Sequence, residues 1–89
     1  MPVFIVIAST KPNDLERIIT SKIASTDNFR VDQNTWLISP PANVVTPKEL
    51  SDFLDISQGS AGQIFISILG AYYGYHNREM WAWISSKGA

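Results

Sequence analysis

Residues 3–7 have the sequence Val3-Phe4-Ile5-Val6-Ile7, and residues 64–69 have the sequence Ile64-Phe65-Ile66-Ser67-Ile68-Leu69. Both runs are nearly continuous in apolar residues and rich in β-branched side chains, a pattern typical of strands buried on both faces of a sheet. We therefore expect one strand over about residues 3–9 and a second over 64–69, paired beside the first at or close to the sheet centre. The architecture depends on these two strands being neighbours.

A first helix is predicted to follow the turn residues 10–13. Asn13 and Glu16 have the spacing of a capping box at a helix N-terminus. Apolar residues then recur at helical spacing and form one stripe that can pack on the sheet, namely Leu15, Ile18, Ile19 and Ile23. The polar residues 26–28 end this helix.

Two short strands and a second helix are predicted next. Phe29 and Val31 alternate with polar residues, and the β-rich residues 35–39 follow a tight connection, which predicts an antiparallel hairpin. The sequence Thr46-Pro47-Lys48-Glu49 combines a hydroxyl cap, a proline at the first helical position and a glutamate that can reach back to the cap. A second helix therefore begins there, with Leu50, Phe53 and Leu54 buried, and the polar residues 58–60 close it.

The last part of the chain fits either a short helix opened by Asn77 or a final strand, and we favour the helix. The element order then predicts one domain over residues 1–89 of the α+β class: a ferredoxin-like split βαβ sandwich. It has a four-stranded antiparallel sheet, two helices on one face and a short C-terminal element. The other sheet face is left for water or a partner.

Composition excludes several kinds of site. Seven basic residues against eight acidic ones give a formal net charge of −1, so the chain lacks the positive field that non-specific nucleic-acid binding requires. With no cysteine, it has no disulfide, thiolate nucleophile or cysteine-based metal site. No apolar stretch reaches the roughly 20 residues of a bilayer span. We expect a cytoplasmic protein with no membrane contact, no metal and no cofactor.

Three Trp, three Tyr and four Phe are more aromatic residues than one small core readily hides. We expect the surplus to cover an interface, because Tyr and Trp are enriched in protein interfaces. Stacking of single-stranded nucleic acid is the less favoured alternative, since Arg78 and Lys87 are the only basic residues of the tail. The candidate interface or binding residues are Tyr72, Tyr73, Tyr75, His76, Arg78, Trp81 and Trp83.

His76 is the only histidine and could act as a general acid or base near neutral pH. Arg78 and Glu79 could join it in a cluster similar to a metal-free ribonuclease site. Adjacency in sequence does not place these side chains together, and we favour an exposed turn residue. No catalytic residue is assigned.

Three short motifs, Lys11-Pro12, Thr35-Trp36-Leu37-Ile38 and Glu49-Leu50, lie in a layout that resembles a known group. It is similar to the small dimeric CRISPR-adaptation subunit and its relatives, which include VapD-like endoribonuclease toxins. In nuclease-active members an aspartate at the end of the first strand binds a divalent metal at the dimer axis. The equivalent residues 7–10 contain no carboxylate, so the resemblance implies a shared fold without metal-assisted cleavage.

The sequence thus predicts a non-catalytic interaction module, a homodimer that binds a protein partner through its aromatic tail. The alternative is a metal-independent or degenerate endoribonuclease or toxin related to the CRISPR-adaptation group. A small protein of a mobile element that blocks a host complex would share the features of the first hypothesis.

Overall fold

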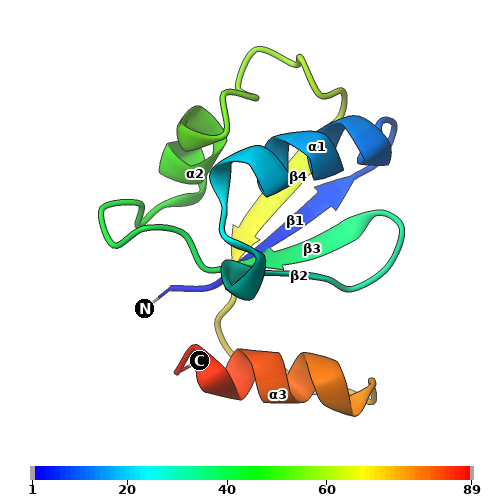
Figure 1. Cartoon of the computed structure of the whole chain (residues 1–89), viewed down its shortest axis with the longest axis vertical. Coiled ribbons are helices and arrows are strands. Elements are labelled where there is room, and N and C mark those ends of the chain that lie inside the picture. The colour runs from blue at the N-terminus through cyan, green and yellow to red at the C-terminus, as the bar shows by residue number, and fades with distance from the viewer. Residues whose placement is uncertain (1, 89) are drawn as a thin grey trace.

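The computed structural model describes residues 2–88 and has the strands and helices shown in Figure 1. In chain order these are β1 (Phe4–Ala8), α1 (Pro12–Lys22), the 3-10 turn η1 (Ser25–Asp27), β2 (Asn28–Arg30), β3 (Thr35–Ile38), α2 (Pro47–Phe53), β4 (Ile64–Ile68) and α3 (Arg78–Ser86). Over residues 2–88 the molecule is therefore an α+β domain with three helices and a four-stranded sheet.

The four strands form one antiparallel sheet in the order β2-β3-β1-β4. Val6 of β1 lies opposite Trp36 of β3 on one side and opposite Ile66 of β4 on the other. The two apolar runs are therefore neighbours, as expected. However, β4 forms an edge of the sheet, whereas β1 lies in its interior.

Side-chain alternation along β1 divides the core between the two sheet faces. Phe4, Val6 and Ala8 point to the face covered by α1 and α2, which we call the inner face. They pack there with other fully or nearly fully buried side chains, including Leu15, Ile19, Trp36, Ile38, Leu50 and Leu54.

Helix α3 packs on the opposite sheet face, which we call the α3 face. Met80 and Ile84 of α3 form a second buried cluster with Val3 and Leu37, and Ile5 packs against it. Figure 1 shows α3 well separated from α1 and α2. The predicted C-terminal helix is confirmed, but the expected open sheet face is wrong in part, because α3 covers some of it.

The capping box of α2 is confirmed. The Glu49 backbone N–H donates to Thr46 Oγ1 at 3.1 Å, and the Thr46 backbone N–H donates to Glu49 Oε1 at 3.0 Å. The helix ends at Phe53, earlier than the predicted close at residues 58–60. Asp55 takes a left-handed conformation with φ of 59°, which a continuing helix cannot accommodate.

The predicted cap of α1 is wrong. This helix begins at Pro12, with Lys11 at the N-cap and no side-chain cap. Proline fixes a helical φ and lacks the N–H that a cap would satisfy, so it starts the helix one residue before Asn13. Glu16 is thereby free to make a different contact.

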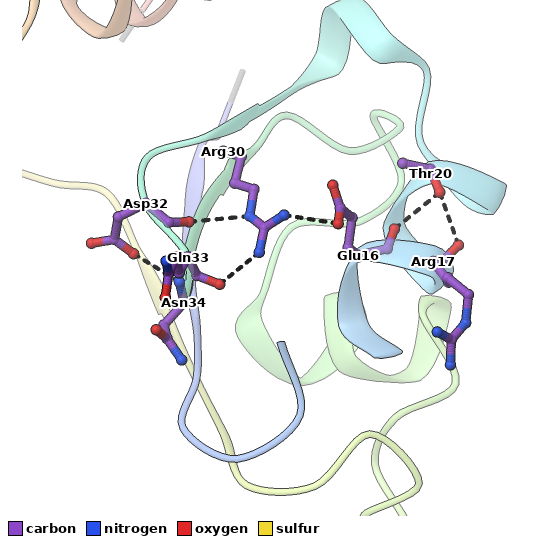
Figure 2. A network of polar contacts seen from close by, with 7 residues as sticks. All are labelled: Glu16, Arg17, Thr20, Arg30, Asp32, Gln33 and Asn34. Carbon is purple, nitrogen blue, oxygen red and sulfur yellow. Dashed lines mark hydrogen bonds and ion pairs between the residues drawn. The ribbon is translucent and has the colours of Figure 1, made fainter. Parts of the chain in front are cut away.

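Arg30 of β2 ties the β2–β3 hairpin to α1 (Figure 2). Its guanidinium donates to Glu16 Oε2 at 2.8 Å, to the Gln33 carbonyl at 2.8 Å and to the Asp32 carbonyl at 3.2 Å. It also lies over the ring of Trp36, with 4.8 Å between Cζ and the ring centroid. One side chain thus fixes the hairpin loop and its distance from the helix.

None of the helices in the described part of the chain has the length and apolarity needed to span a bilayer.

Candidate interaction surface

The chain leaves β4 and crosses to α3 through residues 69–77, which form neither helix nor strand. Asn77 ends this segment by capping α3, because its Oδ1 accepts the Met80 backbone N–H at 2.8 Å. Four of the predicted residues, Tyr72, Tyr73, Tyr75 and His76, lie in it. We call residues 72–76 the tyrosine segment.

Helix α3 is fixed to the body of the domain at its C-terminal half. The indole N–H of Trp83 donates to the Thr26 carbonyl at 3.1 Å, and the rings of Trp83 and Phe29 pack with centroids 6.3 Å apart. Lys87 Nζ pairs with Asp27 Oδ1 at 2.7 Å. These contacts hold one end of the tyrosine segment, and β4 holds the other.

An open apolar groove of about 230 Å³ lies between the tyrosine segment, α3 and the sheet. Ile5, Leu37 and Val31 of the α3 face form its floor, together with Thr35 and Leu69. Met80, Trp81 and Ile84 line it from α3. The residues of the tyrosine segment line the remaining side.

The predicted site residues divide into two groups in the structure. Tyr72, Tyr73, Tyr75, His76 and Trp81 all line the groove. Tyr72 stacks on Trp81 with centroids 6.2 Å apart and 15° between the ring planes. Tyr73 and Tyr75 are fully exposed, with relative exposures of 101% and 103%, so no intramolecular packing explains either ring.

Trp83 and Arg78 lie outside this groove. Trp83 is half-buried against η1 and β2 through the contacts given above, so its role is to dock α3. Arg78 is the first residue of α3 and is exposed. Among residues 2–88, no hydrogen bond or ion pair joins Arg78 or Glu79 to His76, and the three-residue cluster does not form.

His76 is exposed, and its Nδ1 accepts the backbone N–H of Asn77 at 2.9 Å. Asp32 lies in the β2–β3 loop, next along the chain to Val31 of the groove floor. The Asn34 backbone N–H, which donates to Asp32 Oδ1 at 2.9 Å, lowers the pKa of Asp32, and Thr35 and the charge of His76 lower it further. Asp32 therefore stays ionised and places a negative charge beside one end of the groove.

The sequence did not predict the apolar floor of the groove. In the sheet register Ile5 lies directly opposite Leu37, and both side chains point to the α3 face. The alternation of Val3, Ile5 and Ile7 along one face of β1 carries this information, but it does not say which element covers that face.

A second hollow of about 370 Å³ lies between the C-terminal ends of α1 and α3. Its lining includes Lys87 and Asp27, which pair with each other, and Lys22, which donates to the Phe53 carbonyl at 3.2 Å. Within residues 2–88, no three His, Asp or Glu side chains come close enough together to hold a metal ion.

Comparison of the chain with family models, with curated proteins and with solved structures found no match.

Proposed function

We propose that this chain is a small interaction module that binds an apolar segment of a partner protein in the groove beside the tyrosine segment. In this proposal the module is a homodimer and makes no covalent change to its partner. The observation that carries the proposal is the full exposure of Tyr73 and Tyr75 at the rim of an apolar groove. Exposed aromatic rings around an apolar depression are a common feature of protein-binding surfaces.

The size of the groove favours a protein partner over a small substrate. At about 230 Å³ it lies below the roughly 300–1,000 Å³ of most small-molecule sites, and it is open to solvent. It has room for one or two apolar side chains of a partner. The Tyr72–Trp81 stack gives these side chains a pre-ordered aromatic surface, which lowers the entropy lost on binding.

The tyrosine segment offers hydrogen bonds at the rim. Tyr73 and Tyr75 carry phenolic hydroxyls. In the ring of His76, Nδ1 accepts the backbone N–H of Asn77, and Nε2 can bond to a partner. A partner segment with apolar anchors and backbone polar groups matches this surface. Arg78 lies two residues after His76 and is exposed at the start of α3.

We include in the proposal that the fold is ferredoxin-like. The order β1-α1-β2-β3-α2-β4, the sheet order β2-β3-β1-β4 and the position of α1 and α2 on one face support it. Kinship with the CRISPR-adaptation group would then be one of fold, since residues 7–10 carry no carboxylate for a metal.

Selection of peptides from a displayed random library, with the purified chain as bait, tests the proposed binding. Fluorescence anisotropy then compares the wild type with the double variant Tyr73→Ala and Tyr75→Ala. We expect binding at least about tenfold weaker in the double variant, because both rings contribute contacts only in the complex. Val45→Ala removes an exposed apolar side chain elsewhere and should bind like the wild type. Equal binding by all three proteins, or no enriched peptide, would contradict the proposal.

Incubation with single-stranded RNA, with and without Mg²⁺, separates this proposal from the endoribonuclease alternative. The module should leave the RNA intact in both conditions. Cleavage that is lost in His76→Ala would favour the nuclease instead.

A further inference from the structure

Strand β4 is paired on one side only. In the sheet order β2-β3-β1-β4 its sole neighbour within residues 2–88 is β1. Two of its large apolar side chains are exposed, Phe65 at 62% and Ile68 at 49%. An unprotected apolar edge strand is a template for pairing with a further strand.

The backbone groups that face this free edge can be identified from the register. Ser9 N–H donates to the Gln63 carbonyl at 2.9 Å, and Leu69 N–H donates to the Val3 carbonyl at 2.7 Å. These bonds put the odd-numbered residues of β4 in hydrogen-bonded pairs with β1. The N–H and C=O groups of Ile64, Ile66 and Ile68 therefore point to the free edge.

The edge lacks the charged residues and prolines that commonly prevent association. Residues 56–75 contain no charged side chain and no proline. Monomeric proteins commonly protect an edge strand with lysine, proline or an inward-pointing charge. Two copies of β4 can therefore approach each other without like-charge repulsion.

We propose that β4 pairs antiparallel with β4 of a second copy, around a two-fold axis at Ile66, to form a continuous eight-stranded sheet. This inference names the interface of the homodimer in the proposed function and rests on that part of it. With the axis at Ile66, Ile64 of each copy lies opposite Ile68 of the other. All the outward N–H and C=O groups of Ile64, Ile66 and Ile68 then find partners.

The same register covers the exposed side chains. Phe65 of each copy lies opposite Ser67 of the other on the α3 face, in a non-hydrogen-bonded pair whose side chains approach closely. On the inner face, Ile68 packs on Ile64 of the second copy. A register shifted by two residues would leave one outward residue of each copy without a partner.

Sedimentation equilibrium over a range of concentrations tests the interface, with Phe65→Lys as the disrupting variant. In the proposed dimer the two lysines would lie diagonally across the axis, and we expect the dimer dissociation constant to rise by about tenfold or more. Val45→Lys places the same charge at an exposed apolar residue outside the edge and should leave the constant unchanged. A wild type that stays monomeric, or a dimer that Phe65→Lys does not weaken, overturns the inference.

Disulfide cross-linking tests the register and does not depend on the folding of Phe65→Lys. The natural chain has no cysteine, so Phe65→Cys and Ser67→Cys each carry a single thiol. In the proposed register these thiols face each other, with a Cα separation of roughly 4.5 Å, which a disulfide can span. An oxidised mixture of the two variants should give cross-linked heterodimer about tenfold faster than either variant gives homodimer. Equal rates overturn the register.

These outcomes separate the interface from the proposed binding function. If the chain is monomeric but still binds groove peptides through Tyr73 and Tyr75, the interface fails while the interaction module stands. If the dimer forms through β4 and no groove peptide binds, the interface stands without that function.

Discussion

The indole N–H of Trp83 donates to the carbonyl oxygen of Thr26 at 3.1 Å, joining residues 57 positions apart in the sequence. This bond fixes α3 against η1 and β2. The segment before α3 therefore connects two anchored elements, β4 and α3. Tyr73 and Tyr75 lie in this segment, and both of their rings are fully exposed.

Replacing Trp83 by phenylalanine should weaken the docking of α3. The variant loses the bond to Thr26 and part of the packing on Phe29, so we expect a loss of about 1–2 kcal/mol in the free energy of unfolding. Urea denaturation followed by circular dichroism measures it. Trp81→Phe is the matched control, because the indole N–H of Trp81 makes no hydrogen bond within residues 2–88 and its ring stacks on Tyr72. Its free energy of unfolding should fall by less than that of Trp83→Phe. Equal losses would contradict the docking role of Trp83.

Gly62 and Gly59 form a matched pair for a steric prediction. Both have positive φ, 85° and 83°, but a Cβ at Gly62 would lie 2.3 Å from Thr10 Oγ1, whereas a Cβ at Gly59 would meet nothing within 4 Å. Gly59→Ala should cost about 1 kcal/mol from backbone conformation alone, and Gly62→Ala about 2–3 kcal/mol. Thermal unfolding compares the two variants.

The double variant Thr10→Ala with Gly62→Ala checks the cause of this difference. Removing Oγ1 relieves the steric conflict, although it also deprives the Gln63 backbone N–H of its acceptor at 3.0 Å. The cost of Gly62→Ala should therefore be smaller in the Thr10→Ala background than in the wild type. The same cost in both backgrounds would rule out contact with Thr10 as the cause.

Arg30 gives a third prediction. Lysine at this position keeps the charge but cannot reach Glu16, the Asp32 carbonyl and the Gln33 carbonyl at once while covering Trp36. Arg30→Lys should therefore lower the free energy of unfolding by about 1–2 kcal/mol. Arg17→Lys changes an exposed arginine paired with Asp14 and should cost less than about 0.5 kcal/mol. Similar costs for both variants would contradict the role assigned to Arg30.

The lowered pKa of Asp32 predicts a dependence of stability on pH. A carboxyl group whose pKa is lower in the folded state binds protons more weakly there than in the unfolded chain. Its contribution to stability is present above the usual pKa of 3.8 and is lost as the pH falls through the lowered folded value. Stability should therefore decline below about pH 4, and part of that decline should vanish in Asp32→Asn.

Asp52 has a lowered pKa for a similar reason, since it accepts hydrogen bonds from the Ser57 hydroxyl and from Lys48. The two single variants and the double variant separate the contributions, with urea denaturation measured at several values from about pH 5 to pH 2.5. A decline in Asp32→Asn as steep as in the wild type would contradict the prediction for Asp32.

Local sequence signals predicted the elements whose determinants lie within a few residues. The box of Thr46 and Glu49 begins α2 as expected, and the β-branched runs around Ile5 and Ile66 form neighbouring strands. The cap at Asn13 failed because Pro12 is itself a strong helix start. When two start signals adjoin, spacing alone does not rank them.

Contacts between distant elements were beyond the reach of the sequence. The pattern of α3 predicts an apolar stripe with Met80 and Ile84, but it does not say that the stripe packs on Leu37 on the α3 face. Trp81 and Trp83 also look alike in the sequence. Only the packing of α3 shows that Trp81 stacks on Tyr72 whereas Trp83 bonds to Thr26.

Two-dimensional ¹⁵N NMR of the indole N–H groups during titration with a selected peptide tests the central claim most directly. The three tryptophans have different surroundings: Trp36 is buried on the inner face, Trp83 is bonded to Thr26, and Trp81 lines the groove. We predict that the Trp81 signal shifts on binding while the Trp36 and Trp83 signals stay nearly unchanged. A shift confined to Trp36 or Trp83, with the Trp81 signal unmoved, would contradict binding at the tyrosine segment.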